Sequence, residues 1–375
     1  MKIPYAWRNT FQDKKRTLAA VSGIAFSVLL MFMQLGFLDT TKRGTTLLYQ
    51  YLDFDLIITS DKYELMTSTL LIDRARLIQA MIVPGVEEVM GLNIGDGIWE
   101  DPDTEITSGV MFIGIDLNPS FIKNQDVIAN LDTLAQSKTV MLDVLSNSDY
   151  GPLKIGREAR INNVDVKVTS LFRLGMVFYN DGAVLVNNQT FQSLKRGNSR
   201  KVTFGLIKIS PGADLLKTKL DLKENLPDDV LVFDREELLT HEQDYYINVV
   251  PVGIMFQAGV FIAFVIGAVI LFQVLATEVT NRLNEFATLK AMGYSTLRIY
   301  LIGFKQALIF AILGYIPAMI FCIAILYFLR TMARMPAKFT FELGGFVLVM
   351  TLAMCLISGF LALQKVRKAD PADLF

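Results

Sequence analysis

The 375-residue sequence has few of the residues on which most metal and redox sites depend. His241 is the only histidine, which excludes a cluster of histidine metal ligands. The only cysteines, Cys322 and Cys355, lie in apolar runs and are expected to behave as small buried hydrophobes, so no structural disulfide is predicted. No G-x-x-x-x-G-K-[ST] motif occurs. The chain is therefore not expected to bind and hydrolyse a nucleotide by itself.

An excess of charge of either sign is also missing. The 36 basic and 37 acidic residues leave a net charge of −1, which gives no indication of nucleic acid as a partner. Hydrophobic residues make up 52% of the chain, and the mean hydropathy is +0.41. That composition is too apolar for an ordinary soluble protein and too charged for a chain buried in membrane throughout.

Four long apolar runs are expected to cross a membrane as helices, because about 20 apolar residues span a hydrocarbon core of about 30 Å. They cover residues 17–38, 249–275, 299–329 and 343–363. We interpret the first as an uncleaved helix, since no small-residue cleavage site precedes Asp39. Residues 1–16 are predicted to form a short interfacial helix, with Trp7 and Phe11 on one face.

The basic residues beside the spans predict the orientation of the chain. The N-terminal flank carries Lys2, Arg8, Lys14, Lys15 and Arg16, and the C-terminal flank carries Lys365, Arg367 and Lys368. Both short connections between spans also carry basic residues, so they do not distinguish between the two possible orientations. We therefore expect cytoplasmic termini, an outer domain at 39–248, a cytoplasmic connection at 276–298, a short outer loop at 330–342 and a cytoplasmic tail at 364–375.

The outer domain is expected to be α+β. Strand-like residues 53–60 precede a helix-like run and a second strand at 86–91, and residues 201–210 precede the same pattern, which ends at 230–233. Two strand–helix–strand units on either side of an insertion predict a split βαβ module that is closed by its own two ends. Residues 154–191 alternate like strands between Asn- and Gly-containing turns, so the insertion is predicted to be rich in β-structure.

The connection between the second and third spans has the pattern of an amphipathic helix. Val279, Leu283 and Phe286 fall at i, i+4 and i+7, and Gly293 follows the last periodic residue. Such a helix can lie on the bilayer surface or enter a groove on a soluble partner. A solvated connecting loop is the alternative.

Two spans carry small residues every four positions, and these allow close approach of helix backbones. They are Ala19, Gly23 and Ser27 in the first span, and Gly259, Ala263 and Gly267 in the second. This spacing predicts a helix–helix or dimer interface, although glycine and alanine are also frequent in membrane helices for no special reason. Lys305 is expected to extend its charge to the membrane surface, and Gly314 and Pro317 to kink the third span.

Two other candidate sites in the outer domain have simpler explanations. Asp53 and Asp55 alternate along a strand-like run. They resemble paired catalytic carboxylates, but their alternation with Phe54 at the start of a strand favours solvated edge charges. Five scattered methionines suggest a copper site or, more simply, core packing; they are Met66, Met81, Met90, Met111 and Met176.

With this topology, three motifs resemble the MacB/FtsX-type permeases of ABC transporters (type VII, mechanotransmission). EFATLKAMG at 285–293 is similar to the family's cytoplasmic coupling segment, and VRKADP at 366–371 to its basic tail. WRN at 7–9, KRTL at 15–18 and GIA at 23–25 are similar to its entry into the first span. The split βαβ module resembles the family's "porter" and the insertion its "sabre". FRLG at 172–175 and NDG at 180–182 most resemble the DevC subgroup of cyanobacterial glycolipid exporters.

The resemblance implies a non-catalytic subunit of the bacterial inner membrane that acts as a homodimer with a separate ABC ATPase, which binds the ATP. It further implies a periplasmic membrane-fusion (adaptor) protein, an outer-membrane channel and a lipid or glycolipid substrate. Residues expected to contact the ATPase are Arg282, Leu283, Glu285, Phe286, Leu289, Lys290, Met292 and Gly293. An FtsX-like signalling scaffold that regulates a partner such as a cell-wall hydrolase is the alternative.

Overall fold

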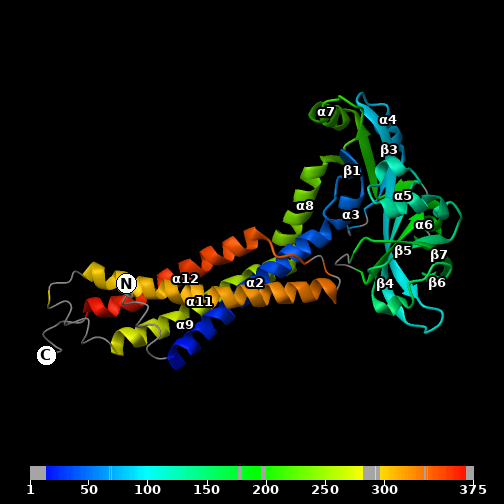
Figure 1. The fold of residues 1–375 in the computed structure, drawn as a ribbon. Helices are drawn as coiled ribbons and strands as arrows, with labels where there is room; N and C mark the ends of the chain where they lie inside the picture. Colours follow the sequence, from blue (N-terminus) through cyan, green and yellow to red (C-terminus); the bar gives the residue numbers. More distant parts are fainter. Residues whose placement is uncertain are drawn as a thin grey trace. The chain divides into compact units, whose positions relative to one another are not determined.

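The computed structural model describes residues 14–66, 68, 70–175, 180–195, 200–281, 292, 296–332, 335 and 337–368 (Figure 1). The chain divides into two compact units. One is a helical bundle from Met1–Thr40, Pro251–Ala333 and Ala337–Phe375, and the other is an α/β domain from Thr41–Val250 and Arg334–Pro336. Each unit is described by itself.

Within the described residues, the bundle contains four helices that are long and apolar enough to cross a membrane. They are α2 (Lys14–Thr45), α9 (Pro251–Asn281), α11 (Thr296–Thr331) and α12 (Phe341–Lys368). The predicted fold class, four membrane helices with an α+β domain inserted between the first two, is therefore confirmed. The helices extend beyond the predicted apolar runs, because backbone hydrogen bonding continues through charged residues such as Lys42 and Arg43 in the last turn of α2.

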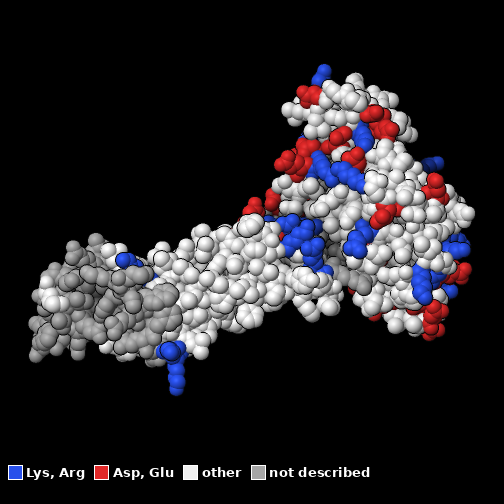
Figure 2. Space-filling model, viewed as in Figure 1, with Lys and Arg blue, Asp and Glu red and all other residues white. Residues whose placement is uncertain are grey.

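All four helices contribute to one apolar core. Ile24 and Val28 of α2, Leu271 of α9, Ala311 of α11 and Met354 of α12 are all buried in it. Large apolar side chains also cover the outer faces of the helices, as expected for contact with lipid. On the face shown in Figure 2 the described surface of the bundle carries very few charges, whereas the α/β domain carries charges of both signs.

The α/β domain contains one nine-stranded sheet in the order β11-β1-β10-β3-β4-β8-β5-β7-β6 and a two-stranded sheet of β2 and β9. The strands are β1 (Leu56–Ser60), β2 (Ile72–Asp73), β3 (Val86–Glu100), β4 (Thr107–Ile115), β5 (Thr139–Asp143), β6 (Glu158–Ile161), β7 (Val164–Phe172), β8 (Gly182–Asn187), β9 (Lys201–Val202), β10 (Phe204–Ile209) and β11 (Val230–Asp234). The helices are α3 (Leu47–Tyr51), α4 (Ala75–Met81), α5 (Gln125–Asn130), α6 (Asn188–Lys195), α7 (Leu215–Asn225) and α8 (Arg235–Asn248), with short 3-10 turns at Pro119–Phe121, Leu131–Leu134 and Ser148–Tyr150.

The split βαβ module is one half of the large sheet. β1 from the start of the domain pairs antiparallel with both β10 and β11 from its end, and β10 pairs antiparallel with β3. The two strand–helix–strand units, β1-α4-β3 and β10-α7-β11, therefore interleave as the sequence predicts. Strand β3 continues from this half into the insertion, where it pairs with β4 and β6.

Helices cover both faces of this half of the sheet. Leu56 and Ile58 of β1 point into a core with Leu77 of α4 and Leu222 of α7. Between them, Ile57 points to the opposite face and joins a second core. That second core contains Leu48 and Tyr49 of α3 and Leu238 of α8. Alternate strand residues thus place α4 and α7 on one face, and α3 and α8 on the other.

Candidate functional site

The predicted ATPase-coupling segment lies almost entirely outside the described residues. Helix α9 ends at Asn281 and α11 begins at Thr296. Of the eight residues named for this contact, the structure describes only Met292, which is in a turn and 63% exposed. The role of the segment stays a prediction.

The small residues of the first two spans meet within one chain. The hydroxyl of Ser27 on α2 donates to the carbonyl of Ala263 on α9, and a Cβ built on Gly267 would lie 2.9 Å from the Cβ of Ser27. A Cβ on Gly23 would lie 2.8 Å from Ile270, and one on Gly259 would lie 2.6 Å from the Gln34 amide carbon. Ala19 is exposed. Apart from Ala19, these residues therefore pack α2 against α9, and their use in a dimer stays a prediction.

Side-chain hydrogen bonds also join the other helices of the bundle. The Ser358 hydroxyl on α12 donates to the Ala268 carbonyl on α9 at 2.8 Å, and the Tyr315 hydroxyl on α11 donates to the Gly344 carbonyl on α12 at 2.9 Å. Bonds of this kind contribute about 0.6 kcal/mol each on average within membranes. In the described parts of the spans, these polar groups hydrogen-bond between helices.

The remaining candidates from the sequence have structural roles. Asp53 pairs with Lys208 at 2.8 Å and Lys123 at 3.3 Å, and an Asp55 carboxylate oxygen accepts from the Ile209 backbone N–H. These contacts at the start of β1 engage the two carboxylates separately and do not form a paired carboxylate site. Met66, Met90 and Met111 are buried in the domain core and Met81 is exposed, while Met176 lies outside the described residues. Both cysteines are free and buried in the bundle, and Lys305 is exposed.

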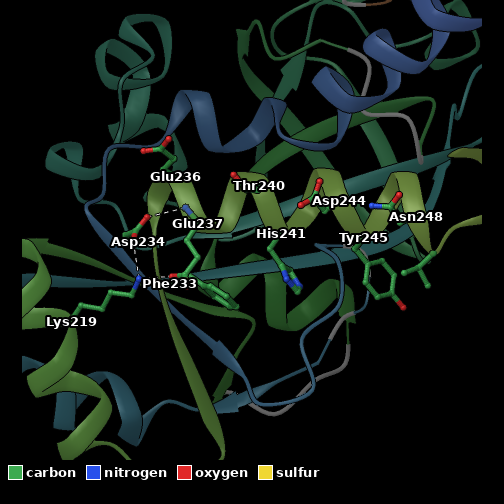
Figure 3. Close-up of a pocket in the computed structure, with 11 residues that line it drawn as sticks. Lys219, Phe233, Asp234, Glu236, Glu237, Thr240, His241, Asp244, Tyr245 and Asn248 are labelled. Carbon is green, nitrogen blue, oxygen red and sulfur yellow. Dashed lines mark hydrogen bonds and ion pairs between the residues drawn. The ribbon is translucent and has the colours of Figure 1, made fainter.

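A pocket of the α/β domain runs along one side of α8 and has a volume of about 790 Å³ (Figure 3). Asp234, Glu236, Glu237 and Asp244 make its rim acidic, and the Lys219 ammonium pairs with the carboxylates of Asp234 and Glu237. Phe233, His241 and Tyr245 supply aromatic walls. Among the described residues, no group of three or more His, Cys, Asp and Glu side chains is placed to hold a metal ion.

The carboxyl group of Glu242 lies on the side of α8 that faces the core, and the residue is only 1% exposed. Its Oε1 accepts hydrogen bonds from the Tyr49 hydroxyl at 3.0 Å and from the Tyr63 hydroxyl. The two hydroxyl oxygens lie 3.0 Å apart. Burial raises the pKa of Glu242 to about 7, although both tyrosines and the Met66 backbone N–H favour its ionised form.

The sequence analysis did not identify this cluster, although one signal was present. Leu238, Glu242 and Tyr246 recur at four-residue spacing, and all three are buried. A glutamate within an apolar helical stripe indicates a buried carboxyl. Its partners were not accessible from the sequence, because Tyr49 and Tyr63 lie 193 and 179 residues away along the chain.

With the four spans and the inserted domain established, comparison with known proteins adds the class of the membrane part. Residues 258–371 match the family described as FtsX-like permease C-terminal. This match includes most of α9, the connection that follows it, and helices α11 and α12. The C-terminal part of the chain thus resembles the FtsX-like permease C-terminal family. A search of curated proteins finds no match.

Several solved structures resemble the α/β domain at low sequence identity. The periplasmic region of MacB from Actinobacillus actinomycetemcomitans is 12% identical, covers 50% of this chain and 92% of its own, and has a TM-score of 0.37. The extracellular domain of the noncanonical ABC-type transporter YknZ from Gram-positive bacteria is 10% identical, with coverages of 48% and 98% and a TM-score of 0.34. A domain of a Porphyromonas gingivalis protein described as a permease is 17% identical, with coverages of 48% and 90% and a TM-score of 0.32.

Proposed function

We propose that this chain is the permease subunit of an ABC-type exporter that transmits motion to an outer domain and catalyses no reaction itself. The observation that carries this proposal is the FtsX-like permease match over residues 258–371, in a chain with four membrane-spanning helices. ATP would be bound by a separate ATPase. Two copies of the permease, each with its connection at 282–295 docked on an ATPase, would form the working unit.

The connectivity of the chain supports transmission through the first two spans. Helix α2 is separated from α3 of the outer domain by Thr46 alone, and α8 is separated from α9 by Val249 and Val250. A movement of the inner end of α9 would therefore reach the outer domain through a nearly continuous helical path. The outer domain would then move a substrate that is already outside the membrane.

For the complete assembly, we propose a periplasmic adaptor protein, an outer-membrane channel and a lipid or glycolipid as substrate. These partners rest on the resemblance of residues 172–175 and 180–182 to the DevC subgroup. A signalling scaffold that activates an extracytoplasmic hydrolase is the second candidate, since the same architecture would transmit motion to a bound enzyme. The identity of the bound partners distinguishes the exporter from the signalling scaffold.

Affinity purification of the tagged chain in mild detergent tests this proposal. We expect an ABC ATPase to co-purify, together with an adaptor protein if the chain serves export. The native mass should correspond to two copies of the permease and two of the ATPase. Recovery of a hydrolase in place of the adaptor would favour the signalling scaffold, and recovery of the chain without any ATPase would contradict both.

The proposed orientation can be tested with single cysteines in a chain from which Cys322 and Cys355 have been removed. An impermeant thiol reagent should label Asn163→Cys in intact cells, because this residue lies in the outer domain. It should label Ser295→Cys only after the membrane is opened, since the connection after α9 is expected to be cytoplasmic. The reverse pattern would overturn the proposed direction of transmission.

A further inference from the structure

Helices α3 and α8 are the segments through which the α/β domain joins the rest of the chain. Each is separated from a membrane-spanning helix by one or two residues, α3 from α2 and α8 from α9. Both pack on the same face of the sheet, in the core that contains Tyr49 and Leu238. The two helices that connect the domain along the chain to the first and second spans are therefore packed in one core.

Polar side chains hold α8 against α3 at two levels. In the first turn of α8, the Arg235 guanidinium donates to the Leu52 carbonyl at 3.0 Å and to the Tyr49 carbonyl. It also lies 4.8 Å from the centre of the Phe54 ring. Two helical turns further along, Glu242 accepts the hydrogen bond from the Tyr49 hydroxyl. The single residue Tyr49 is thus bound through its backbone at one level and through its side chain at the other.

A third segment, the loop after β1, completes the second level. Tyr63 belongs to this loop, and its hydroxyl donates to the same oxygen of Glu242 that Tyr49 uses. The rings of Tyr49 and Tyr63 both pack edge-on against Phe204 of β10. One carboxyl group in an apolar environment therefore connects three chain segments.

We propose that Glu242, Tyr49 and Tyr63 form a proton-controlled clasp that joins the segment after the first span to the helix before the second. Protonation of the carboxyl strengthens the clasp, because no charge then has to be buried. Ionisation weakens it, and α3 and α8 separate more easily. The part of this inference that concerns transmission rests on the proposed function.

The titratable and charged groups around Glu242 come from α3, the loop after β1 and α8 itself. Tyr49 on α3 and Tyr63 in the loop are its direct partners, and Phe204 on β10 is apolar. On α8 itself, the Arg235 guanidinium is bound to backbone carbonyls, and His241 stacks on Tyr63. Glu64, which follows Tyr63, interacts with the Tyr245 hydroxyl.

The direction of the pH effect follows from the raised pKa of Glu242. The ordinary value is 4.5, and burial raises it to about 7 in the folded domain. In the folded domain, Glu242 therefore keeps its proton over a pH range in which it is ionised in the opened state. The stability that this group contributes is fully present below pH 4.5 and is lost as the pH rises through about 7.

Hydrogen exchange of the full chain in nanodiscs, measured between pH 5 and pH 8 and corrected for the chemical exchange rate, tests the clasp. In the wild type the opening equilibrium at the amides of α3 and α8 should increase tens of fold over this range. Glu242→Gln keeps the shape of the side chain but cannot ionise, so its opening should be independent of pH. Glu236→Gln, a matched change at an exposed site on the same helix, should retain the wild-type profile.

Tyr63→Phe provides a second and independent measurement. It removes one hydrogen-bond donor to the ionised carboxylate, so the midpoint of the pH transition should move to higher pH. A purely structural role for Tyr63 would change the extent of opening without moving the midpoint. Wild-type pH dependence in Glu242→Gln, or an unchanged midpoint in Tyr63→Phe, would overturn the clasp.

The stimulated ATPase activity of the reconstituted complex tests the part that concerns transmission. The ratio of Glu242→Gln activity to wild-type activity should rise as the pH increases from 6 to 8, because the wild-type clasp weakens over this range. A constant ratio alongside the expected exchange profiles would overturn the role in transmission. Absence of any stimulation by the wild-type chain would contradict the proposed function while the exchange result still tests the clasp.

Discussion

The double variant Phe286→Ala/Leu289→Ala is expected to lose its partner ATPase. The two side chains lie on the apolar stripe of the 282–295 connection, which has a helical spacing that suits insertion into a groove. Buried apolar anchors at the centre of such a contact contribute about 2 kcal/mol each. Together they should weaken binding on the order of 1,000-fold, measured as co-purification and as stimulated ATP hydrolysis.

Glu285→Gln is the matched control within the same segment. Its charge lies beside the apolar stripe, where rim charges mostly affect the association rate, so the loss of affinity should be about tenfold or less. Expression and membrane insertion should be normal in all these variants, because the segment lies outside the spans. If the double variant recruits and stimulates the ATPase like the wild type, the segment is only a surface connector.

The broad architecture was predictable from the sequence because the signals that define it are local. An apolar run of about 20 residues has few structures open to it other than a spanning helix. The split βαβ module was also predictable, since each of its units shows its own change from strand to helix periodicity. Exact helix ends were less accessible, because a helix continues through charged residues as long as its backbone can hydrogen-bond.

The length of β3 was not apparent from the sequence. The strand was expected to end at Gly91, whereas it continues to Glu100 and joins the two halves of the sheet. Gly95 and Gly97 suggest a turn, but their role is to make space for neighbours. A Cβ on Gly95 would lie 2.7 Å from Cζ of Phe112, and one on Gly97 would lie 2.8 Å from Cγ of Asn162.

The candidate sites show the same difference between features that local sequence indicates and features that depend on contacts between distant segments. In the structure Ser27, Ala263 and Gly267 lie where α2 packs against α9. Their spacing in the sequence could not indicate whether the partner was the same chain or a second copy. The clasp at Glu242 depends on two tyrosines from distant segments, and only the folded domain brings them together. A pattern within one helix identifies a face that is suited to packing. Which residues pack against that face depends on the tertiary structure.

Gly314 illustrates this difference and gives a prediction with a large effect on the bundle. The kink at Gly314 that the sequence suggests stays a prediction, and the structure places the residue at the contact between α11 and α2. A Cβ at this position would lie 2.6 Å from Cγ2 of Ile24 and 3.3 Å from the backbone nitrogen of Ala25. The absence of a side chain therefore allows the two helices to approach closely.

Gly314→Leu should consequently force α2 and α11 apart and destabilise the bundle. Overpacking of this kind typically costs about 1–3 kcal/mol, and here the Cβ alone would lie 2.6 Å from Cγ2 of Ile24. The matched control is Gly345→Leu on α12, where a Cβ would meet nothing within 4 Å. Thermal unfolding of the purified chain in detergent should show a clear loss of stability for Gly314→Leu and little change for Gly345→Leu.

Because α2 is the first of the two spans proposed to carry motion, Gly314→Leu should also reduce stimulated ATPase activity at temperatures where the chain is still folded. Equal stability of the two variants would mean that α2 and α11 are not held in this close contact.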